Sequence, residues 1–280
     1  MINLRSGIFF LLLGTTLAAA VPDPVVIKRT GDEWTLDTGI VRKVVRLEAG
    51  RLVLASFRNE VSGREYVSAA QPSPEIRFTV DGAIITGTTG GWTLVGDQVR
   101  PLGPGQWQLD LKLRREAIEV VKHYVAYAGT PIIREWVTIT NAGRKAVKIS
   151  APCFLAANLQ AGEAADLDLS YVTGGGDYNG SQLLKTEAMT PDYSRVFDSQ
   201  VGIQNGYYSA YLPLLVQRNR RTHDGLMVGW DYLGHWTLHV GADAATGRRG
   251  DLSLQVGGYA KTLEPGQQLD PEGFYRRLHR

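Results

Sequence analysis

A carboxylate on the apolar face of a predicted β-hairpin is the first group in this sequence that could do chemistry. Residues 123–141 contain two runs of alternating apolar and polar residues joined by a Gly- and Pro-containing turn, which is typical of paired half-buried strands. We expect Val125 and Tyr127 to lie on the apolar face of the first run, and Glu135 to lie on that of the second. A buried charge must be paired, hydrogen-bonded or protonated. Glu135 is therefore either ion-paired with an arginine, such as Arg134 or one from a neighbouring strand, or a functional carboxylate.

Aromatic residues form the second candidate site. Three aromatic side chains fall within seven residues near the end of the chain. Sugar rings present C–H faces that stack on such rings, whereas packing in the core is the alternative explanation. The candidate carbohydrate-binding residues are Trp230, Asp231, Tyr232 and Trp236, together with Glu135. The remaining tryptophans are scattered and are expected in the core: Trp34, Trp92, Trp107 and Trp136.

The sequence predicts no metal site and no cofactor. His235 and His239 have the spacing with which two ligands on a helix share a metal ion. The surrounding alternation predicts a strand instead, in which four positions span about 13 Å. The run that begins at Asp166 starts like a calcium-binding loop, but its sixth position is Tyr171, where the turn needs glycine.

Patterns for phosphate binding or covalent catalysis are also missing. The glycines at residues 174–176 do not stand between a strand and an amphipathic helix, so they predict a flexible loop. The chain contains no Gly-x-Ser-x-Gly sequence, and its only thiol, Cys153, lies in an apolar run. We therefore expect no nucleophilic triad.

Composition favours one large domain made of strands. The chain has 280 residues, of which 44% are hydrophobic and 21% charged, with a net charge of +2. This charge indicates no nucleic-acid or membrane-surface role, and the basic residues at 218–221 are expected in a solvated turn. Frequent Gly, Pro and β-branched residues, without a sustained helical period, predict an all-β architecture of more than about a dozen strands.

Several segments carry the elements that would position these residues. The alternation is clearest at 106–113, where one face is apolar and the other polar. Residues 147–155 predict one strand, and residues 156–195 predict long loops. Further strands are predicted at residues 34–36, 40–47, 52–54, 64–68, 76–80, 83–86, 212–217, 226–233, 236–240 and 252–256.

The first twenty residues predict a secretory signal peptide. A basic start is followed by a short apolar run and by the small residues Ala18 to Ala20. The run is shorter than the ~20 residues of a membrane-spanning helix, although a retained anchor is the alternative. We expect a single mature domain of residues 21–280 in a secreted or periplasmic location. With Cys153 as the only cysteine, it has no internal disulfide.

Four segments resemble, in order and spacing, the N-terminal β-supersandwich of the α-galactosidases (melibiases) of glycoside hydrolase family 36. They are VRLEAGRLVLASFRNEVSGREYV at 45–67, TPIIREWVTITNAG at 130–143, GLMVGWDYLGHWTLHV at 225–240 and LEPGQQLDPEGF at 263–274. The similarity covers nearly the whole mature chain, although its motifs are diffuse. It implies a galactose-mutarotase-like β-supersandwich of two large antiparallel sheets.

The resemblance also implies a function. Family members hydrolyse α-galactosides with two aspartates on a catalytic barrel, and no segment here corresponds to that barrel. We expect a truncated or split member, not catalytic by itself, that binds an α-galactoside or other carbohydrate, or supports a catalytic barrel in another chain. An oligomer is possible. Two alternatives are a stand-alone aldose 1-epimerase, with His123 or His239 and Glu135 as acid and base, and a secreted scaffold without sugar affinity.

Overall fold

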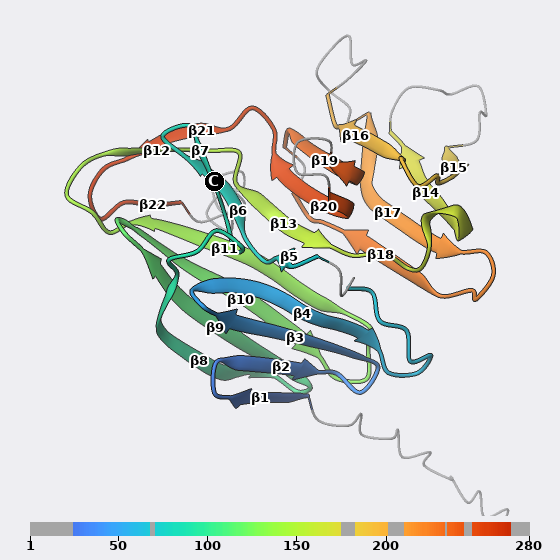
Figure 1. The fold of residues 1–280 in the computed structure, drawn as a ribbon, viewed down its shortest axis with the longest axis horizontal. Coiled ribbons are helices and arrows are strands. Elements are labelled where there is room, and N and C mark those ends of the chain that lie inside the picture. Colours follow the sequence, from blue (N-terminus) through green and yellow to red (C-terminus); the bar gives the residue numbers. More distant parts are fainter. Residues whose placement is uncertain are drawn as a thin grey trace, which may run out of the picture.

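Antiparallel strands make up almost all of the described chain. The computed structural model describes residues 25–67, 71–174, 183–200, 210–232, 234–243 and 248–269, within which it contains 22 strands and one 3₁₀ helix (Figure 1). Every strand pairing in these ranges is antiparallel. The all-β prediction is confirmed, and hydrogen bonding divides the strands among five sheets. The predicted signal peptide lies outside the described residues.

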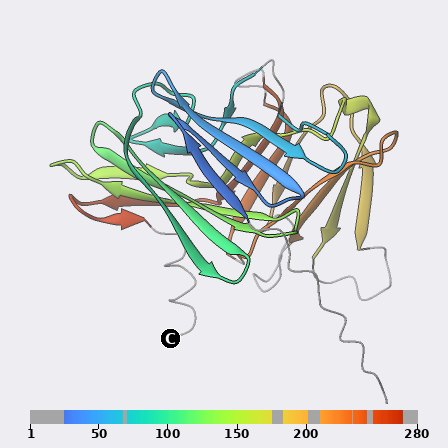
Figure 2. The same cartoon turned by 90° about the horizontal axis from the view of Figure 1, so that it is seen from below.

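Two five-stranded sheets form the first half of the molecule and pack face to face (Figures 1 and 2). Alternating side chains of both sheets, such as Val45 and Leu111, are fully buried between them. The first sheet has the order β1 (Val26–Thr30), β2 (Glu33–Asp37), β3 (Val41–Glu48), β4 (Arg51–Asn59) and β5 (Ser73–Pro74). The second has the order β22 (Gln268–Leu269), β11 (Ile133–Asn141), β10 (Ile118–Tyr127), β9 (Gln106–Arg115) and β8 (Thr93–Gly103).

Two four-stranded sheets form the second half. Phe197 of one sheet packs edge-on against Tyr171 and Tyr211 of the other, at ring-centroid distances of 4.9 and 5.2 Å. One sheet has the order β13 (Cys153–Asn158), β20 (Arg248–Val256), β19 (Trp236–Asp243) and β16 (Ser194–Asp198). The other has the order β15 (Leu184–Ala188), β14 (Leu167–Thr173), β17 (Tyr211–Asn219) and β18 (Gly225–Gly229), and η1 (Ala164–Asp166) precedes β14.

A third four-stranded sheet, with shorter strands, joins the halves. Its β12 continues the chain from β11, and its β6 contacts β13 of the second half. Phe78 of β6 packs edge-on against Trp92 with ring centroids 6.5 Å apart, so this sheet shares the hydrophobic core of the first half. Its order is β21 (Ala260–Leu263), β12 (Val147–Ser150), β6 (Arg77–Val80) and β7 (Ala83–Thr86).

The structure departs from three predictions about strands and loops. Residues 147–155 form two strands in different sheets, because Ala151, with φ of 46°, and Pro152 break the run. Residues 156–195 were predicted as loops, yet they contain β14 and β15 and the start of β16. The exposed β15 has no apolar face, so it carries no periodic signal. Of the predicted strand at 64–68, Ser68 lies outside the described residues, and the rest is present only as isolated bridges at Glu65 and Val67.

The hairpin that carries Glu135 consists of β10 and β11. The cross-strand partner of Glu135 is Tyr124, so these two side chains point to one face, while Val125 pairs with Arg134 on the other. The inward positions of β10 are therefore the even-numbered ones, and the prediction that Val125 and Tyr127 share the face of Glu135 is wrong. Lys122 and Tyr124 occupy that face, and their polar ends concealed its alternation.

Candidate functional site

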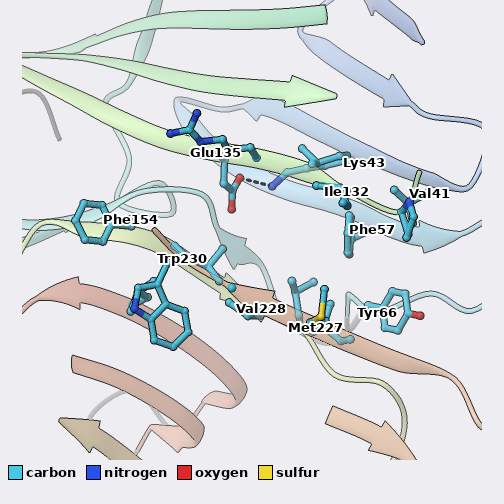
Figure 3. Close-up of a pocket in the computed structure, with 18 of the residues that line it drawn as sticks. Val41, Lys43, Phe57, Tyr66, Ile132, Glu135, Phe154, Met227, Val228 and Trp230 are labelled. Atoms are coloured by element: carbon cyan, nitrogen blue, oxygen red, sulfur yellow. Dashed lines mark hydrogen bonds and ion pairs between the residues drawn. The ribbon is translucent and has the colours of Figure 1, made fainter. Parts of the chain in front are cut away.

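A cleft of about 900 Å³ opens between the two halves of the molecule (Figure 3). One wall comes from β3, β4 and β11, and the other comes from β13, β17, β18 and the segment that follows β18. Met227 and Ile132 lie at this cleft and are 64% and 49% exposed. The volume is in the range of small-molecule sites.

Seven aromatic residues line the cleft. Phe57 belongs to β4 and Phe154 to β13, so rings reach the cleft from both halves. Phe154 and Tyr232 contact each other with ring centroids 5.3 Å apart. The full aromatic lining is Phe57, Tyr66, Tyr127, Trp136, Phe154, Trp230 and Tyr232.

Glu135 and Lys43 form one of two ion pairs in the lining, and Arg134 and Asp231 form the other. Lys43 Nζ donates to Glu135 Oε2 over 2.6 Å, and Figure 3 shows this pair above the aromatic wall. Lys122 Nζ lies 3.3 Å from the same oxygen. The side chain of Glu135 is 12% exposed, whereas Lys43 and Lys122 are 6% and 2% exposed. Glu135 is therefore a partly accessible carboxylate whose charge is balanced by two nearly buried lysines.

The ion pair belongs to a buried group of five side chains, which we call the ion cluster: Lys43, Glu75, Lys122, Tyr124 and Glu135. Lys43 Nζ also lies 3.1 Å from Glu75 Oε1, and Tyr124 Oη donates to Glu75 Oε2 over 2.5 Å. Both ammonium groups lie over the Tyr124 ring, at 5.0 and 5.4 Å from its centroid. Two ammonium groups thus balance two carboxylates in a region without bulk water.

Burial and pairing shift the pKa values of the ion cluster in opposite directions. Burial opposes ionisation of Glu135, but Lys122 and Lys43 outweigh it and lower the pKa of this carboxyl. Burial raises the pKa of Glu75, and Lys43 offsets this only in part. Burial also raises the pKa of Tyr124 well above its usual value, which keeps its hydroxyl protonated as the donor to Glu75.

The structure brings together four of the five predicted carbohydrate-binding residues. Glu135, Trp230, Asp231 and Tyr232 line the cleft. Trp236 is 1% exposed and lies behind Trp230, with the two rings edge-on at 4.6 Å, so it supports the wall. Core packing, the alternative weighed for the aromatic cluster, is therefore what the structure shows for Trp236.

The ion pair predicted for Glu135 is present, but the prediction of an arginine partner is wrong. Its partners are Lys43 and Lys122, whereas Arg134 points to the other face of β11 and contacts Asp231 at 3.2 Å. The same signal that singled out Glu135 could have found Lys43, because it stands between Val41 and Val45 on the apolar face of β3.

The structure does not assemble the acid–base pairs weighed for an epimerase. His123 is the cross-strand neighbour of Trp136, so it points away from the face that carries Glu135. Its Nδ1 bonds to Asp110 over 2.6 Å, and its Nε2 to the Thr138 hydroxyl over 3.0 Å. His239 belongs to another sheet, where it bonds to Ser194 and Asp251.

No metal site or membrane span is found within the described ranges. They contain no group of three or more His, Cys, Asp or Glu side chains placed to hold one ion, nor a helix of sufficient length and apolarity to cross a membrane. Asp198 is the partner of His235, so the two histidines at four-residue spacing bond to different aspartates. Burial raises the pKa of Cys153 to about 12, which makes this thiol a poor nucleophile.

Comparison with solved structures relates the fold to α-galactosidases of glycoside hydrolase family 36. AgaB from Geobacillus stearothermophilus superposes over 87% of this chain with a TM-score of 0.64 and 14% identity. The galactosidase domain of the α-galactosidase–sucrose kinase AgaSK superposes over 87% of this chain with a TM-score of 0.62 and 13% identity. The α-galactosidase from Lactobacillus brevis superposes over 85% with a TM-score of 0.58 and 13% identity. At this identity the likeness shows the fold alone.

The likeness covers only part of these enzymes. The present chain spans 39% of the length of AgaB, 40% of that of the AgaSK chain and 38% of that of the Lactobacillus brevis enzyme. AgaA, a further neighbour from Geobacillus stearothermophilus, has been solved in complex with stachyose and with raffinose. No family model and no curated protein sequence matches the chain.

Proposed function

We propose that this chain is a carbohydrate-binding domain that does not cleave glycosides by itself, of the kind that accompanies the barrel of an α-galactosidase-like glycoside hydrolase. The observation that carries the proposal is the composition of the cleft, in which aromatic rings from both halves stand beside the carboxylate of Glu135 and the ammonium of Lys43. The likeness of the fold to α-galactosidases supports it.

The cleft has the two kinds of surface that a sugar needs. The faces of Trp230 and Phe154 can stack on the C–H faces of a pyranose. Glu135 and Asp231 can accept hydrogen bonds from ring hydroxyls, while Lys43 can donate one. The chemical class of ligand is thus a neutral saccharide, and an α-galactoside is the first to test.

Isothermal titration calorimetry with galactose, melibiose and raffinose tests the proposal. We expect at least one of these sugars to bind the purified chain, and Trp230→Ala to weaken binding by roughly tenfold, or ~1.4 kcal/mol, through loss of stacking. Trp230→Phe should retain most of the affinity.

Trp107→Ala is the matched control for the Trp230 variants. Trp107 is half-buried on β9 and does not line the cleft, so its loss should leave sugar affinity unchanged. Thermal melts of all variants exclude unfolding as the cause of lost binding. Equal losses in Trp107→Ala and Trp230→Ala would contradict a sugar site in the cleft.

Support of a catalytic barrel is the second candidate function, and the exposed Met227 and Ile132 favour it. Apolar side chains at the mouth of a cleft are typical of surfaces that another domain covers. Under this alternative none of the three sugars gives heat, and the dye ANS, which binds exposed apolar surface, fluoresces less with Met227→Glu than with the parent chain.

Two activity measurements test the expected lack of glycosidase and mutarotase activity. We expect the purified chain neither to hydrolyse p-nitrophenyl α-galactoside nor to accelerate the mutarotation of galactose or glucose. Mutarotation that disappears in Glu135→Gln would establish the epimerase alternative instead. We also propose export to a secreted or periplasmic location, for which N-terminal sequencing of the mature protein should begin near Val21.

A further inference from the structure

A serine, a histidine and an aspartate meet on the outer face of the sheet β13-β20-β19-β16. Ser194 of β16 pairs with Gly241 of β19, and Gly241 pairs with Asp251 of β20. His239 lies two positions before Gly241, on the same face. The register therefore places the imidazole beside both the hydroxyl and the carboxylate, while Leu238 and Val240 face the core.

Hydrogen bonds connect these three side chains in series. Ser194 Oγ lies 3.1 Å from His239 Nε2, and His239 Nδ1 lies 2.9 Å from Asp251 Oδ2. Asp251 is an acceptor, so Nδ1 carries the proton and Nε2 is left to accept from the serine hydroxyl. Ser253 Oγ donates to the same Asp251 oxygen over 2.8 Å, which fixes the carboxylate in place.

Exposure decreases along the series from the serine to the aspartate. Ser194 is exposed, the side chain of His239 is 22% exposed and that of Asp251 is 3% exposed. This is the order that a nucleophilic triad requires, with an accessible hydroxyl, a half-buried base and a buried carboxylate that orients the base. Such triads are recognised by geometry and not by position in the sequence.

We propose that Ser194, His239 and Asp251, here called the outer-face triad, hydrolyse short-chain carboxylic esters. Ser194 Oγ attacks the ester carbonyl carbon while His239 Nε2 takes the hydroxyl proton. The carbon–oxygen bond to the alcohol breaks, and His239 gives its proton to the leaving alcohol. A water molecule then attacks the acyl-serine, transfers a proton to His239 and releases the acid, and that proton returns to Ser194.

The edge position of β16 provides the remaining requirement, a donor for the developing oxyanion. Ser199 N–H bonds to the Trp236 carbonyl, so odd-numbered residues of this segment direct their N–H groups toward β19. The N–H groups of Ser194 and Val196 consequently point away from β19, to the side on which no further strand pairs with β16 among the described residues. The N–H of Ser194 is then beside its own hydroxyl, as an oxyanion donor should be.

The surface beside Ser194 accounts for the expected size of the acyl group. Val196 shares its face, two strand positions or about 7 Å away, and is 61% exposed. One exposed valine offers an apolar contact for an acetyl or propionyl group. Ser194 does not line the 900 Å³ cleft, so this site is separate from the proposed sugar site.

A second hydroxyl–imidazole–carboxylate series in the same chain serves as an internal comparison. Thr138, His123 and Asp110 have the same connectivity at 3.0 and 2.6 Å. Its hydroxyl is a half-buried secondary alcohol, and the Trp136 ring stacks on the imidazole at 4.7 Å. Thr138 is therefore hindered as a nucleophile, and we place no activity there.

Labelling with a fluorophosphonate probe, followed by mass spectrometry, tests the proposal directly. We expect the full chain to be labelled at Ser194 and to hydrolyse p-nitrophenyl acetate faster than p-nitrophenyl octanoate. Ser194→Ala should abolish the label and lower kcat/KM for the acetate at least 100-fold. Ser194 is exposed, so this variant is expected to fold like the parent.

The controls separate catalysis from background reaction at surface histidines. Thr138→Ala should retain the label and the rate, whereas His239→Gln should lose both while keeping the thermal stability of the parent. An unlabelled Ser194, or a rate unchanged in Ser194→Ala, overturns the proposal. Sugar binding by calorimetry is unaffected by these variants, so failure here is distinguishable from failure of the proposed carbohydrate function.

Discussion

The ion cluster beneath the cleft and the outer-face triad use similar charged groups in different surroundings. Lys43, Glu75 and Lys122 are almost fully buried, and each charge is held by a partner of opposite sign. In the triad only Asp251 is buried to that extent, and the series ends in the exposed hydroxyl of Ser194. The difference indicates that the cluster contributes to the architecture of the cleft, whereas the triad retains a group that can react with a ligand from solvent.

Removing a charge from the ion cluster should produce the largest change in stability. Lys43→Met leaves Glu75 and Glu135 in the core with less counter-charge, so we expect a loss of ~3–5 kcal/mol in the free energy of unfolding. Urea denaturation measures it. Arg46→Met on the same strand is the control, since its pair with Glu33 is exposed and should be worth at most ~1 kcal/mol. Equal effects would show that the cluster is no more important than a surface pair.

Loss of the tyrosine hydroxyl should have the next largest effect. Tyr124→Phe removes the donor to Glu75 Oε2 but keeps the ring that both ammonium groups contact. A buried acceptor that loses its donor costs ~1–3 kcal/mol, which chemical denaturation can resolve. A stability unchanged within error would mean that Glu75 finds another donor.

Alkaline pH should weaken the fold through the same cluster. Burial lowers the pKa of Lys43 but Glu135 and Glu75 outweigh it, so the pKa is raised from 10.5, and burial raises that of Tyr124 well above 10.0. Above pH ~10 the unfolded chain therefore loses these protons while the folded chain keeps them, and stability falls. The slope approaches ~1.4 kcal/mol per pH unit for each group.

Urea denaturation at several pH values between 9 and 11 measures this slope. Tyr124→Phe removes one titrating group of the ion cluster, so the dependence should be less steep than in the parent chain by up to ~1.4 kcal/mol per pH unit. Identical slopes in the two proteins would show that Tyr124 does not contribute to the alkaline sensitivity.

Substitution in the outer-face triad, by contrast, should have little effect on stability. Ser194→Ala removes an exposed hydroxyl, so the free energy of unfolding should change by no more than ~0.5 kcal/mol. Urea denaturation beside the esterase assay provides both values. A large destabilisation would assign the triad a structural role like that of the ion cluster and remove the contrast between the two regions.

Part of the candidate site was predictable from alternation alone. Glu135 stood out because it interrupts an apolar face, and Trp230, Asp231 and Tyr232 stood out by proximity in the chain. All four line one cleft. Lys43 was accessible to the same reasoning, since it interrupts the apolar face of β3.

The outer-face triad was not predictable in this way. Ser194 falls in residues 156–195, for which the sequence predicts loops. Asp251 stands just before the predicted strand at 252–256 and belongs to no catalytic motif. The absence of a strand–turn–helix serine motif predicts no nucleophilic triad. Such a motif is one way of presenting a serine, whereas here three strands of one sheet present the three side chains.

The sequence by itself determined the all-β class, most strand positions and the placement of Glu135 on an apolar face, because a period of two residues is a local property of extended backbone. Only the tertiary structure decided which side chains pair with one another. Lys43 and Glu135 are 92 positions apart, and Ser194 and His239 are 45 apart. Which strands become neighbours, and in what register, depends on the summed burial of whole sheets, and local alternation carries no information about that sum.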